Sequence, residues 1–92
     1  VSALRRQAAE AVTHRGVARE KLGDPAGAEG HYRRALALFP LAQTRFNLAV
    51  LAWGKDRSAA EEHLVEALRL EPGRADAAKY LAQLRARSDL RR

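Results

Sequence analysis

The side chains able to act as nucleophiles or general bases are few in this sequence of 92 residues, and they are scattered along it. They are three histidines and three serines, with no cysteine: His14, His31, His63, Ser2, Ser58 and Ser88. A group-transfer reaction needs a nucleophile, a base and an orienting group in one place. No short catalytic motif is present. We therefore expect a protein that is not an enzyme and that uses no cofactor.

These residues also give little indication of a metal site. His31, His63 and Glu62 could in principle supply ligands, but the two histidines occupy the same position of a repeat described below. A residue type repeated at one position more often serves packing, so we predict no metal site. His14 keeps two interpretations, as a solvated polar residue or as a contact to a ligand.

The composition favours helices and gives no sign of a membrane span. Alanine occurs 20 times and leucine 13 times, against five valines, two threonines and no isoleucine, a balance typical of helical proteins. No apolar run approaches the roughly 18 residues of a membrane span, and early charged residues exclude a signal-peptide core. The cytoplasm is the favoured compartment. The chain does not begin with methionine, which favours an excised fragment or a processed chain.

Positive charge gathers at the two ends of the chain. The net charge is +6, with +3 over residues 1–40, −1 over 41–72 and +4 over 73–92. A basic end can attract nucleic acid or anionic lipid, and this remains an alternative function. However, none of the five aromatic residues is interleaved with the arginines, as a stacking platform for bases would require. We therefore do not expect a nucleic acid partner. The excess of arginine over lysine beside so much alanine is typical of a GC-rich genome and favours a bacterial source.

A repeat of about 33 residues divides the chain. A shift of 32 residues brings eight of the 17 positions from 24 to 40 onto an identical residue: Asp24/Asp56, Ala28/Ala60, Glu29/Glu61, His31/His63, Ala35/Ala67, Leu36/Leu68, Leu38/Leu70 and Pro40/Pro72. A shift of 33 aligns the segments that follow, with Leu48 opposite Leu81 and Ala49 opposite Ala82. Repeats of this length are typical of architectures in which each unit is one supersecondary motif.

Glycine, aspartate and proline mark where helices stop and start. Gly23–Pro25 supplies a C-terminal glycine, an N-cap aspartate and a first-turn proline, and Gly54–Asp56 repeats that turn. Phe39–Pro40 and Pro72–Gly73 end two more helices, while Ser58 competes with Asp56 as a cap. Five helices are predicted, at about 2–22, 25–39, 41–54, 57–71 and 74–88. Their apolar residues recur at steps of three and four, and the short loops make neighbouring helices antiparallel.

The repeated residues resemble the tetratricopeptide repeat, a helix–turn–helix unit of 34 residues. The family's small, aromatic, alanine and proline positions correspond to Ala28, Tyr32, Ala35 and Pro40, and then to Ala60, Leu64, Ala67 and Pro72. The family's tryptophan position departs from the pattern, since it is occupied by Val12, Arg45 and Ala78. The resemblance implies one all-α domain over residues 1–92, a right-handed solenoid of antiparallel helical hairpins. Repeat 1 spans about 9–40, repeat 2 about 41–72 and a capping helix about 74–88, before a basic tail at 89–92.

The resemblance also implies a function. In this family the first helix of each unit lines a concave groove that holds a peptide or a partner protein. The residues expected to line the groove here are Glu10, His14, Val17, Gln43, Asn47, Val50, Trp53, Lys79, Gln83 and Arg87. Of the positions that clamp a peptide carboxylate in some members, only Asn47 matches, so that clamp is not expected. The partner is an unidentified protein or peptide.

Two questions stay open at this point. Leu4, Ala8 and Ala11 give the start of the first helix an apolar side, so the chain could instead be a structural fragment that self-associates into a homo-oligomer through exposed repeat ends. Trp53 is either a binding hot spot or a filler of the gap left by a turn shorter than the family's.

Small residues are expected where paired helices approach closely. Glycine inside a helix costs about 1 kcal/mol relative to alanine, so Gly16 predicts such a contact. The large and small residues expected in the core are Val12, Leu22, Ala28, Tyr32, Ala35, Leu36, Leu48, Leu51, Leu64, Leu68, Leu81 and Leu84. Phe39 and Phe46 are expected at the junctions between units.

Overall fold

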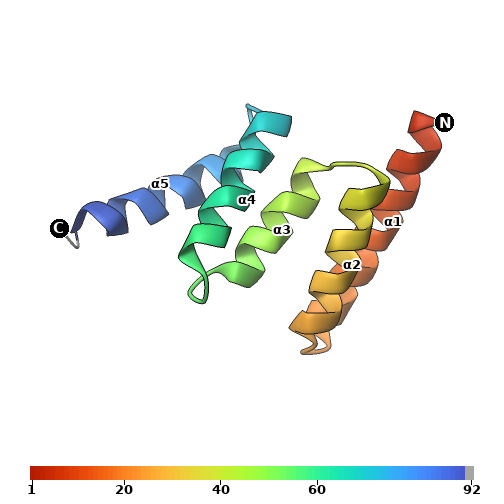
Figure 1. The fold of residues 1–92 in the computed structure, drawn as a ribbon, viewed down its shortest axis with the longest axis horizontal. Helices are drawn as coiled ribbons and strands as arrows, with labels where there is room; N and C mark the ends of the chain where they lie inside the picture. The colour runs from red at the N-terminus through yellow and green to blue at the C-terminus, as the bar shows by residue number, and fades with distance from the viewer. Residues whose placement is uncertain (91–92) are drawn as a thin grey trace.

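The computed structural model describes residues 1–90, with side chains as far as residue 87, and this part of the chain is helical without any strand. The helices are α1 (Ser2–Lys21), α2 (Pro25–Leu38), α3 (Ala42–Ala52), α4 (Arg57–Leu70) and α5 (Ala75–Leu90) (Figure 1). The predicted all-α class and the five helices are confirmed. In the basic tail predicted at 89–92, residues 89 and 90 end α5, and residues 91 and 92 lie outside the described residues.

The two tight turns are built alike. The Asp24 carboxylate accepts a hydrogen bond from the Gly27 amide (2.9 Å) at the start of α2, and the Asp56 carboxylate accepts one from the Ala59 amide (3.0 Å) at the start of α4. Each aspartate thus satisfies an amide that the helix cannot pair. The chain reaches each cap through a glycine at φ near +80°, a conformation that favours glycine. Asp56, not Ser58, is therefore the cap of α4.

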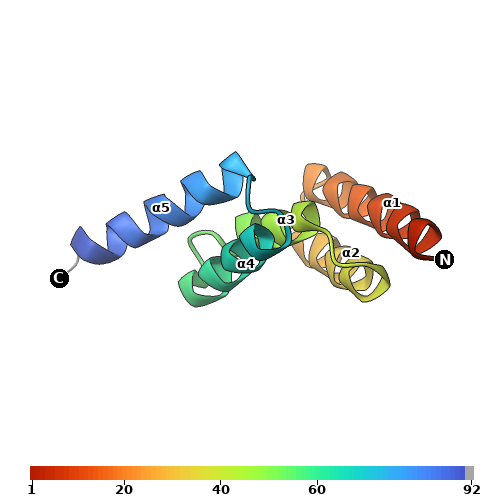
Figure 2. The same cartoon turned by 90° about the horizontal axis from the view of Figure 1, so that it is seen from above.

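The helices pair in chain order. α1 lies antiparallel to α2 and forms hairpin 1, α3 lies antiparallel to α4 and forms hairpin 2, and α5 packs against α4 (Figure 1). α2 also contacts α3 and so joins the two hairpins. Seen from above, α1 and α5 lie on one side of the molecule and α2 and α4 on the other, with α3 between them (Figure 2).

Gly16 allows α1 to approach α2 closely within hairpin 1. A Cβ at this position would lie 2.7 Å from Cδ1 of Tyr32 and 3.0 Å from its Cζ. The Tyr32 ring is fully buried, so it has little room to withdraw. The packing role predicted for Gly16 is confirmed. In hairpin 2, Ala49 occupies the repeat position of Gly16, and the shorter Leu64 occupies that of Tyr32. Both are fully buried.

Two apolar clusters hold the helices together. One joins hairpin 1 to α3, with Ala28, Tyr32 and Leu48 at its centre. The other joins hairpin 2 to α5 and contains Ala42, Ala49, Ala60, Leu64, Ala67, Ala77, Leu81 and Leu84. Alanine supplies five of the eight residues of the second cluster, so the helix axes can come close together there, and the few large side chains fill the remaining space.

Part of the predicted core is wrong. Leu22 is 76% exposed, because it follows the last residue of α1 at the tip of hairpin 1, where no helix covers it. Val12 is only half-buried, since it lies on the side of hairpin 1 that no other helix covers. Leu36, Leu51 and Leu68 are partly buried and border the two clusters.

Candidate partner-binding surface

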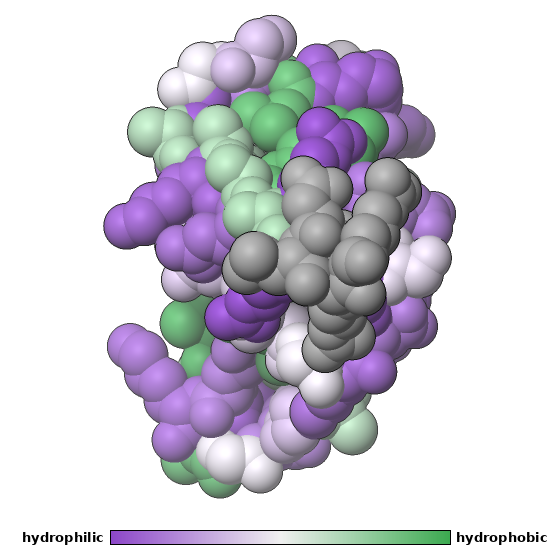
Figure 3. Space-filling view, turned by 90° about the vertical axis from the view of Figure 1, so that its left-hand side faces the viewer, coloured by the Kyte–Doolittle hydropathy of each residue, from purple (hydrophilic) through white to green (hydrophobic). Residues whose placement is uncertain are grey.

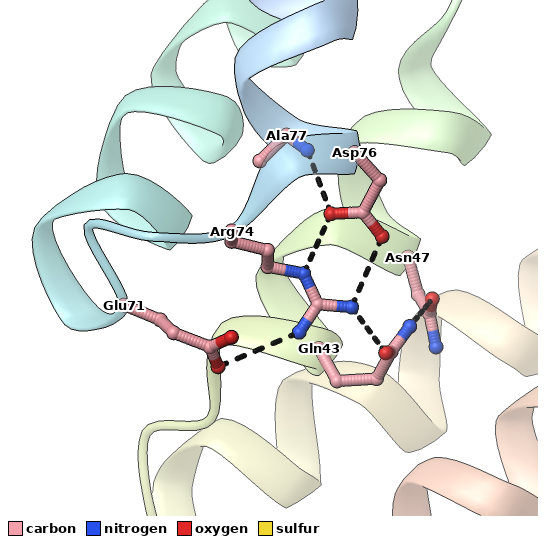
Figure 4. Close-up of polar contacts among 6 residues, drawn as sticks. All are labelled: Gln43, Asn47, Glu71, Arg74, Asp76 and Ala77. Atoms are coloured by element: carbon pink, nitrogen blue, oxygen red, sulfur yellow. Dashed lines mark hydrogen bonds and ion pairs between the residues drawn. The ribbon is translucent and has the colours of Figure 1, made fainter.

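Arg74 organises a polar cluster between α3 and the turn that leads into α5 (Figure 4). Its Nε donates to Asp76 Oδ1 (2.8 Å), and its Nη2 donates to Asp76 Oδ2 (3.2 Å) and to the side-chain oxygen of Gln43. Glu71 lies 3.7 Å from Nη1, and the guanidinium carbon lies 5.5 Å from the centroid of the Phe46 ring. Only 14% of the Arg74 side chain is exposed. Charge-assisted bonds of this kind are stronger than neutral ones, so Arg74 fixes Gln43 relative to α5.

Gln43 holds Asn47 in place. It donates from Nε2 to Asn47 Oδ1 (2.8 Å), which extends the cluster along α3 (Figure 4). The neighbouring Tyr32 hydroxyl donates to Glu20 of α1. Burial, followed by the bond to Glu20, raises the pKa of Tyr32 well above its usual range, against the opposing effect of Asn47. The phenol therefore stays protonated and remains a donor to Glu20.

A pair of buried hydroxyls joins α1 to α3 directly. Thr13 Oγ1 donates to the carbonyl oxygen of Ala9 (2.8 Å) and lies 2.8 Å from Thr44 Oγ1. Because the Thr13 proton is used on Ala9, Thr44 is the donor between the two hydroxyls. Both threonines are at most 3% exposed. Satisfied polar pairs in a nonpolar setting specify one arrangement of neighbouring helices.

A polar hollow of about 480 Å³ opens where the N-terminal half of α1 meets the end of α4 and the start of α3. It contains carboxylates as well as cationic groups, so it offers both donors and acceptors. Its lining residues are Arg6, Glu10, Thr13, His14, Phe39, Pro40, Leu41, Ala42, Gln43, Leu70, Glu71 and Arg74.

An aromatic hollow of about 360 Å³ lies between α3 and α5 and is lined by Val50, Trp53, Lys79, Tyr80 and Gln83. Tyr80 meets two rings edge-on, with its centroid 5.2 Å from that of Phe46 and 5.0 Å from that of Trp53. Such edge contacts are favourable beyond the area they bury. No carboxylate lines this hollow, and its charged residue is Lys79.

Trp53 is partly buried and partly accessible. It packs against Tyr80 in the cluster that joins hairpin 2 to α5, and it directly follows α3. It also borders the aromatic hollow, and the guanidinium carbon of Arg87 lies 5.5 Å from its ring centroid. It is therefore a structural residue with one accessible side.

The structure places seven of the ten predicted groove residues in these two hollows. Glu10, His14 and Gln43 line the polar hollow, and Val50, Trp53, Lys79 and Gln83 line the aromatic hollow. Arg87 stacks on Trp53 beside them, and Asn47 bonds to Gln43. Val17 lies in neither hollow, because it packs against the apolar cluster between hairpin 1 and α3.

Sequence reasoning missed three charged residues of this surface. Arg6, Glu71 and Arg74 all line the polar hollow. Arg6 also lies over the Phe39 ring, 5.4 Å from its centroid. For Arg74 a local signal was available, because an arginine two residues before Asp76 at a helix start can pair with it. Its contact with Gln43 spans 31 residues and has no local signal.

Comparison with known proteins assigns no family. No protein-family model matches the sequence, and no curated protein matches it either.

Among the residues that the structure describes, no group of three or more His, Cys, Asp or Glu side chains is placed to hold a metal ion. None of the helices described combines the length and apolarity that crossing a bilayer requires.

Proposed function

We propose that this chain is a short tetratricopeptide-like array, a right-handed stack of hairpin 1, hairpin 2 and the capping helix α5. In this proposal it binds a peptide or a partner protein on the surface formed by α1, α3 and α5. It acts as a binding module, without catalysis and without a cofactor.

Contacts between successive units support the array. Leu48 of hairpin 2 packs on Ala28 and Tyr32 of hairpin 1, and the Thr13–Thr44 pair joins the first helices of the two hairpins. In repeat arrays each unit is stabilised by its immediate neighbours. Gly16 and Ala49 occupy the same repeat position, and both are buried. Such matching burial is expected when two hairpins are copies of one unit.

The observation that carries the binding proposal is the pair of hollows along α1, α3 and α5. The helices and the short turns between them supply the lining residues, and Arg74 and the three aromatic rings fix the walls. A preformed site loses little conformational entropy when it binds. Tyrosine and tryptophan are also enriched among residues that dominate binding energy.

The two hollows suit different parts of one ligand. The aromatic hollow can receive an apolar side chain, with Lys79 beside it for a carboxylate. The polar hollow, which mixes glutamates with arginines, can pair with backbone amides and carbonyls. An extended peptide or one face of a helix can supply both kinds of group.

Selection from a displayed peptide library on the wild-type protein tests this proposal, followed by titration of the enriched peptides. Lys79→Glu combined with Gln83→Ala changes two exposed residues of the aromatic hollow, and we expect Kd to rise at least about tenfold, or about 1.4 kcal/mol. Arg33→Glu is the matched control, because it reverses an exposed cation on α2, away from both hollows.

Circular dichroism should give the same helicity for both variants. The proposal is wrong if no peptide is enriched, or if the two variants weaken binding equally.

A further inference from the structure

A second surface lies on hairpin 1, and we call it the outer face. It surrounds a hollow of about 470 Å³ lined by Val12, Arg15, His31, Arg34, Ala37 and Leu38. All six residues belong to α1 and α2, and none belongs to hairpin 2 or α5. The outer face is thus separate from the polar and aromatic hollows.

The repeat shows what the equivalent surface does in hairpin 2. Arg15 corresponds to Leu48, and His31 corresponds to His63. Leu48 is 3% exposed because it packs on Ala28 and Tyr32 of hairpin 1.

His63 completes that comparison. It is 9% exposed, and it borders a hollow shared with Glu29 and Arg33 of α2. This side of the unit is therefore covered by a helix in hairpin 2 and remains open in hairpin 1.

The outer face combines positive charge with apolar area. Arg15 and Arg34 are exposed, and no carboxylate is among the lining residues. Arg34 Nη2 lies 2.6 Å from His31 Nδ1, so the arginine donates and the imidazole accepts in its neutral form. Val12 is half-buried and Leu38 is 38% exposed. Apolar side chains beside cations match an amphipathic helix with acidic flanks.

A second copy of this chain does not suit the outer face. In a head-to-tail contact the C-terminal end would meet it, and residues 73–92 carry six basic and two acidic residues. The side of the molecule that faces this direction shows hydrophilic side chains, in purple, beside hydrophobic areas, in green (Figure 3). Two basic ends would repel each other, which disfavours such a dimer.

α1 has no break like the one that joins the two hairpins. α2 ends at Leu38 and α3 begins at Ala42, whereas α1 is a single helix from Ser2 to Lys21. The outer face is therefore not covered by a unit joined to residue 9 in the way that α2 is joined to α3.

We propose that the outer face docks an acidic amphipathic helix of another protein. The carboxylates of that helix would pair with Arg15 and Arg34, and its apolar side would cover Val12 and Leu38. Nucleic acid fits less well, because the lining residues include no aromatic ring on which a base could stack.

The test uses a synthetic helical peptide of about 20 residues, long enough to be helical alone, with leucine and alanine on one face and glutamate on both flanks. Matched peptides carry lysine or glutamine in place of glutamate. Titrations compare the wild type, Arg15→Glu/Arg34→Glu, and the control Arg33→Glu/Arg69→Glu. The control makes the same change of charge at arginines that are 60% and 66% exposed on α2 and α4.

We expect the glutamate peptide to bind the wild type and the control with similar Kd values. Binding to Arg15→Glu/Arg34→Glu should be at least tenfold weaker, and the lysine peptide should bind that variant better than it binds the wild type. If charge reversal unfolds hairpin 1, Arg15→Gln/Arg34→Gln replaces it and should weaken the glutamate peptide at least threefold.

Three results would overturn the proposal. They are no binding of the glutamate peptide to the wild type, equal weakening in the control, and binding of a single-stranded oligothymidylate through Arg15 and Arg34 without binding of the peptide. The aromatic hollow is untouched by these variants, so peptides selected for it should bind as before.

Discussion

Hairpin 1 and hairpin 2 are built on one pattern but close their helices with different side chains. Hairpin 1 sets a glycine, Gly16, against the large ring of Tyr32, and hairpin 2 has Ala49 and Leu64 at the matching positions. Tyr32, Ala49 and Leu64 have no exposed area. The smaller of the two first-helix residues thus goes with the larger of the two second-helix residues: Gly16 with Tyr32, but Ala49 with Leu64. The helices can therefore pair closely in both hairpins.

The pairing also explains a polar difference between the hairpins. The ring of Tyr32 carries a hydroxyl that donates to Glu20, so a polar bond joins the two helices of hairpin 1. Leu64 has no such group and contributes to the apolar cluster with α5. The same repeat position therefore serves a polar junction in one unit and an apolar one in the next.

Gly16→Ala should break this arrangement and have the largest effect of the changes considered. Overpacking a core typically costs about 1–3 kcal/mol, and the fully buried Tyr32 ring can hardly move. We therefore expect a cost at the upper end of that range, about 3 kcal/mol. Alanine returns about 1 kcal/mol of helix propensity, so the net loss in the free energy of unfolding should be about 2 kcal/mol, measured by urea denaturation.

Gly16→Ala/Tyr32→Leu copies the pair found in hairpin 2 and should recover part of that loss. Ala49→Gly is the control in hairpin 2, where propensity alone predicts a loss of about 1 kcal/mol. If Gly16→Ala instead stabilised the protein, the close approach of α1 to the ring would not exist in solution.

The helices could be predicted well from the sequence because their limits are set locally. The aspartate caps, the glycines at positive φ and the proline of Gly23–Pro25 each act within a few residues. Burial was predicted less well, since it depends on which element covers a face. Val12 has the right periodicity for a core residue, yet no helix covers it.

In the candidate surface, too, features set by local sequence could be predicted and features set by distant residues could not. Residues on the expected faces of α1, α3 and α5 could be named from their spacing, and seven of the ten line the two hollows. The bond from Arg74 to Gln43 and the Thr13–Thr44 pair could not, because in each case the partners are 31 residues apart in the chain. Nothing in the local sequence signals that Thr13 bonds across to another helix.

The N-cap aspartates of α2 and α4 also occupy matching positions, and replacing either should change the free energy of unfolding less than Gly16→Ala does. Replacing an N-cap aspartate by alanine typically costs about 0.5–2 kcal/mol, so we expect about 1 kcal/mol for Asp24→Ala and for Asp56→Ala. Asp24 also lies 3.7 Å from Arg19 Nη1, so its loss should cost a few tenths more. Urea denaturation of the two variants and of Ser58→Ala measures this. A loss for Ser58→Ala equal to that for Asp56→Ala would contradict the assignment of Asp56 as the cap.

The matched histidines give the finest comparison, because they differ mainly in whether a neighbouring hairpin covers them. Burial, followed by the charge of Arg45, lowers the pKa of His63 below its ordinary 6.5. Arg33 also lowers it, while Glu62 and Glu29 oppose the change. The unfolded chain then binds more protons than the folded chain between the two pKa values, so stability falls as the pH falls through 6.5.

His63→Gln should remove part of this pH dependence. We expect the loss of unfolding free energy between pH 7.5 and 5.5, measured by urea denaturation at both values, to be smaller in this variant than in the wild type. The pKa of His31 is also lowered, by burial and by nearby arginines. His31 lies on the open outer face, however, and it can take up a proton with less loss of hydration, so His31→Gln should change the pH dependence less. Equal effects of the two variants would mean that hairpin 1 does not cover His63, and the side-by-side packing of the hairpins would then be wrong.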